Sequence, residues 1–388
     1  MHMIGERKLK LGTAGLGRGF TLMLPTLARD PRILLTAAAD PRPEARALFA
    51  TEFNAQTYET VEELCRDPNV EVVYVATPHQ VHAAHTAVAT AGGKHVLVEK
   101  PMAISLAECE AMISAARKAG VRLIVGHSHS FDAPIARTRK LIDSGEFGAV
   151  RMITAINYTD FMCRPRRLEE LDTAQGGGVI FSQAAHQVDI VRLLAGGRAK
   201  SVRAVTGRWD ASRPIEGAYG CLLTFEDDLC ATLTYSGYGQ FDSDELQGWI
   251  GEMGRKKQPG PRTTPRFASA SEEAAFKQAA NYGGVNYRPP AEPDAHQNFG
   301  TVIVSCERAD LRPLPNGVAI YRNGEMQLDA LPAPQIPRGE VIDELYDAVV
   351  NGIAPHHDGH WAMATLEVCL AMMQSSRESR EIELQHQD

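Results

Sequence analysis

Short apolar runs alternate with longer helix-like segments through the first part of the chain. The runs that predict buried strands are residues 10–14, 33–39, 70–76, 95–98 and 122–125. The segments between them are long enough for crossover helices, which neighbouring parallel strands require and which shield the sheet from water. Residues 1–127 are therefore predicted to form a doubly wound parallel sheet, a Rossmann-type α/β domain.

The pattern changes in the rest of the chain, where the apolar runs are longer and follow one another more directly. The runs that predict strands there are residues 150–157, 202–209, 219–225, 229–235 and 300–306. Helices are predicted at residues 134–144, 179–194, 340–350 and 361–376. Residues 128–388 are therefore predicted to form an α+β domain with a largely antiparallel sheet.

Residues 251–293 differ in kind from both domains. Glycine, proline and charged residues surround one helix-like stretch at residues 271–280. Long segments of this kind inside a domain form lids, binding elements or mobile loops. We interpret residues 251–293 as an insertion in the second domain.

Length and charge narrow the class of partner. A chain of 388 residues predicts two domains, each with its own core. The 40 basic and 48 acidic residues give a formal charge of −8, which provides no basic footprint for nucleic acid or an anionic membrane. We therefore expect the partner to be a small-molecule substrate.

The cysteines and the amino terminus bear on the compartment. Seven scattered cysteines form no C-x-x-C pair, which favours reduced thiols over a disulfide framework. Residues 1–10 lack the apolar stretch of a signal peptide, and no run approaches the roughly 20 apolar residues of a membrane helix. We expect a soluble, cytoplasmic protein.

A glycine-rich turn follows the first predicted strand. Gly15 and Gly17 occupy the first two positions of the G-x-G-x-x-G pattern, in which the backbone approaches a pyrophosphate at a helix N-terminus. Arg18 follows them and is counted with the cofactor-binding residues. Phe20 stands where the pattern has a third glycine or alanine, so a glycine-rich turn without a ligand is the alternative for this stretch alone.

An acid ends the second predicted strand. Asp40 occupies the position from which a carboxylate accepts hydrogen bonds from the adenosine ribose hydroxyls and repels a 2′-phosphate. Arg42 and Arg46 are near enough in sequence to receive such a phosphate. We therefore predict NAD as the cofactor, with NADP as the alternative.

The third predicted strand ends in a turn that also faces this edge of the sheet. Thr77 and Pro78 form a rigid turn that is expected to line the nicotinamide ribose, and His82 follows at the start of the next helix. Cofactor contact and a solvated loop position are equal alternatives for His79 and His82.

The fourth predicted strand is followed by Glu99, Lys100 and Pro101. In open α/β sheets ligands bind at this edge, so an amine here can donate to a substrate oxygen and stabilise a developing alkoxide. His186, on the predicted helix 179–194, is the candidate general base because imidazole titrates near neutral pH. A surface lysine and a packed core histidine are the alternatives.

Polar residues near His186 complete the candidate site, for which no metal is predicted. Ser182, Gln183 and Asp189 lie within one helical turn of His186 and are expected to orient its ring. Three arginines precede the helix, and their guanidinium groups suit a carboxylated substrate. The arginines are Arg164, Arg166 and Arg167, and pairing with Glu169, Glu170 and Asp172 is their alternative role.

Taken together, these motifs resemble the Gfo/Idh/MocA oxidoreductase family over nearly the whole chain. The resemblance implies a Rossmann domain, a C-terminal domain whose open sheet serves in dimers or tetramers, and Lys100 and His186 at the reacting carbon. The family's usual aspartate four residues before the histidine is Ser182 here, which leaves Lys100 and His186 as the main pair. The residues that carry it are Gly15, Gly17, Asp40, Thr77, Pro78, Glu99, Lys100, Pro101 and His186, with Gly145 to Gly148 at the domain junction.

Within the family, residues 181–189 and the insertion resemble phthalate 4,5-cis-dihydrodiol dehydrogenases. This implies an NAD-dependent dehydrogenase that oxidises a carboxylated cyclic cis-diol. The alternatives are a sugar or inositol dehydrogenase, a glycoside hydrolase that retains NAD, and a redox-sensing binding module, against which Lys100 and His186 argue.

Overall fold

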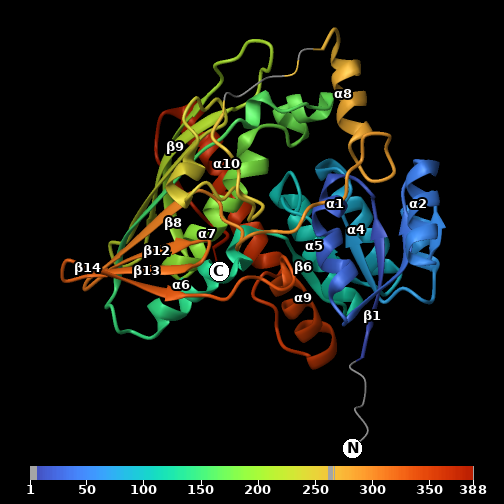
Figure 1. Cartoon of the computed structure of the whole chain (residues 1–388), viewed down its shortest axis with the longest axis horizontal. Helices are drawn as coiled ribbons and strands as arrows, with labels where there is room; N and C mark the ends of the chain where they lie inside the picture. The colour runs from blue at the N-terminus through green and yellow to red at the C-terminus, as the bar shows by residue number, and fades with distance from the viewer. Residues whose placement is uncertain (1–6, 261–264, 266, 388) are drawn as a thin grey trace, which may run out of the picture. The chain divides into compact units, whose positions relative to one another are not determined.

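The computed structural model describes residues 7–260, 265 and 267–387, which form two compact units (Figure 1). Unit 1 holds the described residues up to His127 together with Glu272–Ala291 and Ile336–Met363. Unit 2 holds the described residues of Ser128–Ser271, Glu292–Gln335 and those from Ala364 onward. The first boundary lies at the predicted residue, but two later segments cluster with unit 1, so the second unit is not the continuous domain 128–388 that we expected.

Unit 1 is built on a six-stranded parallel sheet with the order β3-β2-β1-β4-β5-β6. The order reverses between β1 and β4, which is the point where ligands bind in such folds. The strands are β1 Leu9–Ala14, β2 Ile33–Ala39, β3 Gln56–Tyr58, β4 Val72–Val75, β5 His95–Val98 and β6 Leu123–Val125. All five predicted strands are confirmed; β3 was not predicted because its three residues are exposed or half-buried and give no apolar run.

The crossovers between these strands are helical, as the spacing predicted. Ser105 caps the helix after β5 by accepting a hydrogen bond from the Glu108 N–H, and Gly120 ends that helix in the left-handed region. The helices of this part are α1 Arg18–Arg29, α2 Pro43–Phe53, α3 Val61–Arg66, α4 His82–Ala91 and α5 Leu106–Ala119. The later segments add most of α8 Ala270–Ala279, α9 Gly339–Tyr346 and a π-helical stretch at Asp347–Asn351.

Unit 2 is built on a nine-stranded sheet with the order β14-β13-β12-β11-β7-β10-β9-β8-β15. Only the β7–β10 pair is parallel, so the predicted α+β fold with a largely antiparallel sheet is confirmed. The strands are β7 Val150–Tyr158, β8 Ala199–Gly207, β9 Ala218–Phe225, β10 Cys230–Ser236, β11 Thr301–Cys306, β12 Asp310–Leu314, β13 Gly317–Arg322, β14 Glu325–Ala330 and β15 Ile382–Glu383.

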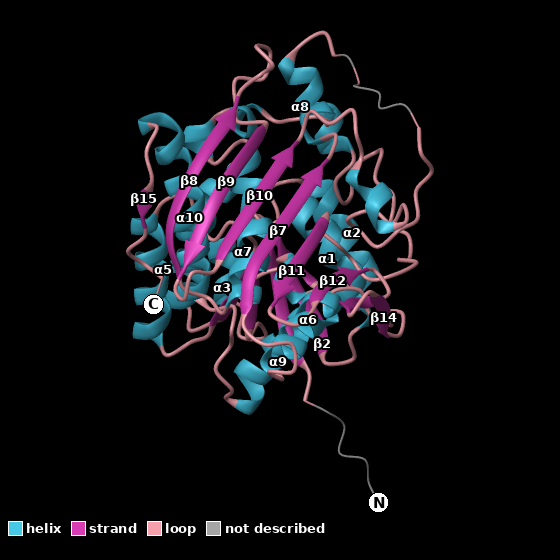
Figure 2. Cartoon of the chain, turned by 90° about the vertical axis from the view of Figure 1, so that its left-hand side faces the viewer, coloured by secondary structure: helices cyan, strands magenta, loops and turns pink. Residues whose placement is uncertain are grey.

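Helices cover one face of this sheet. Figure 2 looks onto the other face, with β8, β9, β10 and β7 in front of α7 and α10. The helices are α6 Ala133–Asp143, α7 Ala185–Ala195 with a π-helical lead at Ile180–Ala184, and α10 Gly359–Glu378, whose first residues belong to unit 1. Short 3₁₀ turns lie at His79–Val81, His129–Phe131, Phe161–Cys163, Leu168–Leu171, Thr173–Gln175 and Ser243–Gln247. Among the described residues, no helix is long and apolar enough to cross a membrane.

Candidate active site

The glycine turn of unit 1 has the form that a pyrophosphate requires. Gly15 has a φ of 91°, and a Cβ there would lie 2.9 Å from the Ala76 carbonyl oxygen, so only glycine fits. Gly17 is the N-cap of α1, and no atom lies within 4 Å of the position its Cβ would take. The first residue of α1 is Arg18. Open space beside the amide groups of a helix N-terminus fits a dinucleotide phosphate.

Phe20 replaces the third glycine without filling this turn. Its ring is fully buried, with centroids 5.9 Å from Phe49 and 5.1 Å from Tyr282. The backbone passes close to Glu99 at Gly19 instead, where a Cβ would lie 3.2 Å from Cγ of Glu99.

Asp40 is tied to neighbouring donors at the end of β2. Its Oδ2 accepts from the Leu16 N–H at 2.7 Å, and its Oδ1 accepts from the Arg42 N–H and Nε at 2.9 and 3.0 Å. Asp40 is 5% exposed. The acid therefore lies beside the glycine turn as expected, and ribose binding by it stays a prediction.

His82 links the two turns that follow β4 and β5. Its Nε2 lies 2.8 Å from the Thr77 carbonyl oxygen and its Nδ1 lies 2.9 Å from that of Pro101. The ring is fully buried, and burial lowers the pKa of His82. The interpretation of His82 as a solvated loop residue is therefore wrong, whereas His79 is half-buried. Pro78 precedes the 3₁₀ turn, as a rigid turn residue should.

Glu99 and Lys100 lie at the carboxyl end of β5, where the Lys100–Pro101 bond is cis. The Tyr74 hydroxyl donates to Oε1 of Glu99 at 2.5 Å. Burial raises the pKa of Glu99, and this effect outweighs the Tyr74 hydrogen bond and the positive charges of Arg338 and Lys100. Two cations thus act on one half-buried carboxyl at the ligand-binding edge of the sheet.

His186 occupies the first turn of α7 in unit 2 and is 5% exposed. Its ring centroid lies 4.7 Å from that of His129 and 5.0 Å from that of Phe299. Its Nδ1 lies 3.5 Å from the hydroxyl of Ser128. The histidine is therefore in a polar and aromatic cluster rather than in a purely apolar core.

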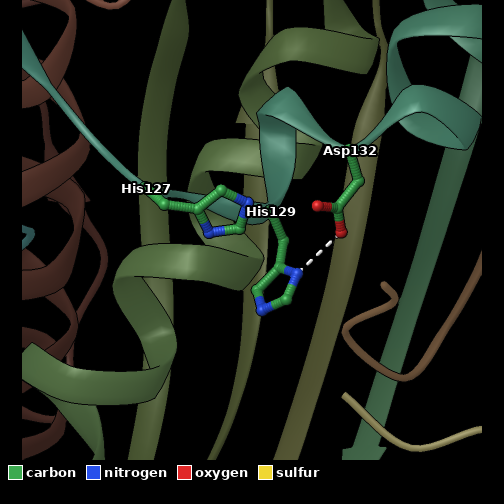
Figure 3. Close-up of side chains that lie close together, drawn as sticks. All are labelled: His127, His129 and Asp132. Carbon is green, nitrogen blue, oxygen red and sulfur yellow. Dashed lines mark hydrogen bonds and ion pairs between the residues drawn. The ribbon is translucent and has the colours of Figure 1, made fainter. Parts of the chain in front are cut away.

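His129 holds a carboxylate on each side of its ring. Its Nδ1 lies 2.7 Å from Oδ2 of Asp132, as the dashed line in Figure 3 marks beside His127, and its Nε2 lies 3.6 Å from Oε1 of Glu252. Burial opposes the charged imidazole, but Asp132 and Glu252 outweigh it, so the pKa of His129 is raised. Ligand atoms of His129, His186 and Glu252 lie within 4.8 Å of one another; the expectation of no metal stays a prediction.

Ser182, Gln183 and Asp189, which lie near His186 in the sequence, each have hydrogen-bond partners in other parts of unit 2 or in the backbone just before the helix. The Ser182 hydroxyl donates to the Gly178 carbonyl at 2.6 Å, and Oε1 of Gln183 accepts from the Tyr235 hydroxyl at 3.2 Å. Asp189 accepts hydrogen bonds from Ser130 and, at 3.3 Å, from Thr365. The sequence therefore predicted correctly that these residues lie in the helical segment of His186. A hydroxyl beside the His186 ring comes from Ser128, which was not predicted.

The three arginines of the predicted substrate cluster have different surroundings. Arg166 is 7% exposed, and its guanidinium carbon lies 3.6 Å from the centroid of the Phe161 ring. Burial lowers the pKa of Arg166 to about 10, so it remains charged at neutral pH. Arg164 is half exposed and bonds to Asp160 at 2.9 Å. Arg167 takes the alternative role, because it pairs with Glu169 at 3.0 Å and Glu170 at 3.6 Å.

Arg164 and Arg166 belong to the surroundings of Tyr235. Burial raises the pKa of the Tyr235 phenol, and both guanidinium charges oppose that rise. Because Tyr235 also bonds to Gln183, the two arginines and the helix that carries His186 share one polar region of unit 2.

Sequence patterns did not reveal several members of these clusters. His129 and Asp132 follow β6, and their i and i+3 spacing next to a predicted strand was the one available signal. Glu252, Tyr235, Phe299 and Arg338 come from separate elements, so only the fold identifies them. Glu252 lies near His129, and Tyr235 bonds to Gln183. Phe299 packs against His186, and the charge of Arg338 acts on Glu99.

Comparison with known proteins identifies the family. Residues 9–127 match the oxidoreductase family with an NAD-binding Rossmann fold, and residues 135–250 match the GFO/IDH/MocA C-terminal domain. The chain belongs to the Gfo/Idh/MocA family. It is an NAD(P)-dependent dehydrogenase, and the predicted resemblance is confirmed.

Individual relatives agree with this assignment. The chain is 47% identical to a 1-carboxy-3-chloro-3,4-dihydroxycyclohexa-1,5-diene dehydrogenase of Comamonas testosteroni over 95% of each chain. It is 32% identical to a trans-1,2-dihydrobenzene-1,2-diol dehydrogenase of Macaca fascicularis over 49% of this chain and 56% of that protein. A crystal structure from Bordetella bronchiseptica RB50 is 38% identical with a TM-score of 0.89, covering 97% of this chain and all of that one.

Proposed function

We propose that this dehydrogenase oxidises a carboxylated cyclic cis-diol, such as a phthalate 4,5-dihydrodiol, with NAD as the hydride acceptor. The similarity to the Comamonas enzyme, whose named substrate is a carboxylated cyclic diol, carries the proposal. Two guanidinium groups near His186's helix support it, because Arg164 and Arg166 suit a carboxylate.

In the proposed reaction, Lys100 donates a hydrogen bond to the reacting oxygen and His186 accepts the hydroxyl proton as hydride leaves the carbinol carbon. The bound nicotinamide supplies the hydride acceptor. Asp132 and Glu252 favour the cationic form of His129, whose ring centroid lies 4.7 Å from that of His186. The ketone product then tautomerises to a catechol, and the aromaticity gained makes the oxidation strongly downhill.

We also propose that NAD is preferred over NADP. Arg42 donates to Asp40 through Nε at 3.0 Å and to the Leu16 carbonyl through Nη2 at 2.9 Å. A guanidinium held in this way, next to a carboxylate, offers little to a 2′-phosphate.

The uncovered face of the unit 2 sheet is our proposed homodimer or homotetramer surface. On this face, one row of cross-strand neighbours crosses β8, β9, β10, β7 and β11. It includes Leu222 and Ile303, which are 43% and 39% exposed. Thr232 and Thr154 lie between these two residues in the row, and exposed apolar side chains on an open sheet face suit an interface. Light scattering tests this: Leu222→Asp with Ile303→Asp should shift the mass to that of one chain, and an unchanged mass would exclude this face.

NADH formation tests the substrate class. Purified protein is assayed with NAD and equal concentrations of a carboxylated cis-dihydrodiol, its uncarboxylated parent diol, an inositol and an aldose. We expect NADH to accumulate fastest with the carboxylated diol. Faster turnover of an inositol or aldose would replace the proposal by a sugar dehydrogenase, and glycoside cleavage without net NADH would indicate a hydrolase that retains NAD.

A further inference from the structure

The tip of the insertion is built into unit 1. Tyr282 lies in the segment Glu272–Ala291, which clusters with unit 1 although the chain on either side belongs to unit 2. Its side chain is fully buried, in ring contact with Phe20 and Phe49 at 5.1 and 6.5 Å between centroids. Its hydroxyl donates to Oε2 of Glu52 at 2.6 Å. Because its ring is packed and its hydroxyl is hydrogen-bonded, Tyr282 anchors this segment to unit 1.

The next residue shows how closely this tip approaches α2. Gly283 has a φ of 77°, and a Cβ there would lie 2.6 Å from Cα of Ala45. No other residue fits that contact without displacing the backbone. The tip is therefore seated against the same helix that follows Asp40.

The seated tip holds Arg42. Nη1 of Arg42 donates to the Tyr282 carbonyl oxygen at 3.1 Å, while Nη2 donates to the Leu16 carbonyl and Nε to Asp40. Each nitrogen of the guanidinium therefore has an acceptor, and two of the acceptors are neutral backbone carbonyls. Arg42 is one of the two arginines near enough in sequence to receive a 2′-phosphate; the other, Arg46, donates through Nη1 to the Asp40 carbonyl oxygen at 2.7 Å.

We propose that residues 272–291 are a clamp that fixes Arg42 against Asp40 and so makes the dinucleotide site select a free ribose 2′-hydroxyl. This rests on the proposed preference for NAD. With the clamp seated, a 2′-phosphate meets the Asp40 carboxylate and a guanidinium whose donors are committed. With the clamp released, Nη1 of Arg42 loses the Tyr282 carbonyl and becomes available to the phosphate, and the penalty against NADP falls.

The clamp also accounts for the departure from the glycine pattern. Phe20 stands at the third glycine position, and its ring forms one wall of the Tyr282 seat. Phe20 and the insertion therefore act together, because the Phe20 ring helps to hold the segment that bonds to Arg42.

Binding of reduced cofactors tests the proposal without any turnover. Dissociation constants of NADH and NADPH are measured by fluorescence for the full chain and its variants. Tyr282→Ala removes the anchor, and Gly283→Ala prevents seating while keeping the tyrosine. We expect both to lower the NADPH to NADH ratio of dissociation constants about 10-fold, a difference of about 1.4 kcal/mol. Limited proteolysis should cut both variants faster within residues 272–291.

Matched variants separate the clamp from a loss of folding. Tyr282→Phe keeps the ring packing and should retain a ratio near that of the parent chain, as should Val285→Ala, at a residue that is 88% exposed. In an Arg42→Ala background, Tyr282→Ala should no longer change the ratio, since its effect acts through Arg42.

Three results would overturn the proposal. The first is an unchanged ratio in Tyr282→Ala and Gly283→Ala when proteolysis shows the segment released. The second is a Tyr282→Ala effect that persists without Arg42. In the third, the parent chain already binds NADPH as tightly as NADH, and then the proposed NAD preference fails as well.

Discussion

The buried pair of His129 and Asp132 makes a prediction whose size and pH dependence both follow from the structure. The two side chains are 1% and 4% exposed, so solvent screens their interaction little. A hydrogen bond to a charged partner contributes about 1.5–3 kcal/mol. Asp132→Asn keeps the shape and an acceptor oxygen but removes the charge, so we expect it to lower stability by about 2 kcal/mol where His129 is charged.

The sign of the pH dependence follows from the pKa of His129. Because that pKa is raised above 6.5 in the folded chain, the stabilisation by Asp132 is complete below pH 6.5 and is lost as the pH rises through the folded pKa. Thermal unfolding of the parent chain and of Asp132→Asn is measured between about pH 5.5 and pH 9, where carboxylates stay charged. The loss in Tm should be about 4–8 °C at pH 6 and should shrink towards pH 9.

An exposed ion pair serves as the control. Asp143, 58% exposed, pairs with Arg139, whose hydrogen bond lowers the pKa of Asp143 further below this range. Asp143→Asn should therefore change Tm little and by the same amount at every pH. A loss in Asp132→Asn that is equally independent of pH would refute the charged state we assign to His129.

Other predictions concern the proposed chemistry. Lys100→Ala should lower kcat/KM for the diol at least about 10²-fold while NADH binding by fluorescence stays near normal, and near-normal turnover would remove its assigned role. Arg166→Leu should raise KM for a carboxylated diol about 10-fold more than for its neutral parent, and equal effects would exclude carboxylate binding. Gly15→Ala should lower stability by about 1–3 kcal/mol in denaturant unfolding, because it combines a positive φ with a clash. Gly17→Ala should leave unfolding unchanged and weaken NADH binding, so equal unfolding of the two variants would contradict this reading of the turn.

The order of strands and helices was predictable because it depends on local patterns. The strands of unit 1 are buried on both faces, as Val72 to Val75 illustrate, and such runs are visible in any sequence. Two of the strands that escaped prediction give a weak pattern: β14 is exposed along most of its length, and β12 contains Pro313. Turn chemistry was equally local, since Gly15, Asp40 and Lys100 all lie within two residues of a strand end.

The amino-acid sequence by itself determined the fold class, the dinucleotide turn and the lysine and histidine that we assign to the reaction, because each depends on residue type and short spacing. Tertiary structure alone decided which distant groups meet. It brought Glu252 to His129, gave His82 a structural role between two carbonyls, and packed Tyr282 of the insertion against Phe20 and Phe49. Such contacts join residues far apart in the chain, and they are set by packing and burial, which no local pattern encodes.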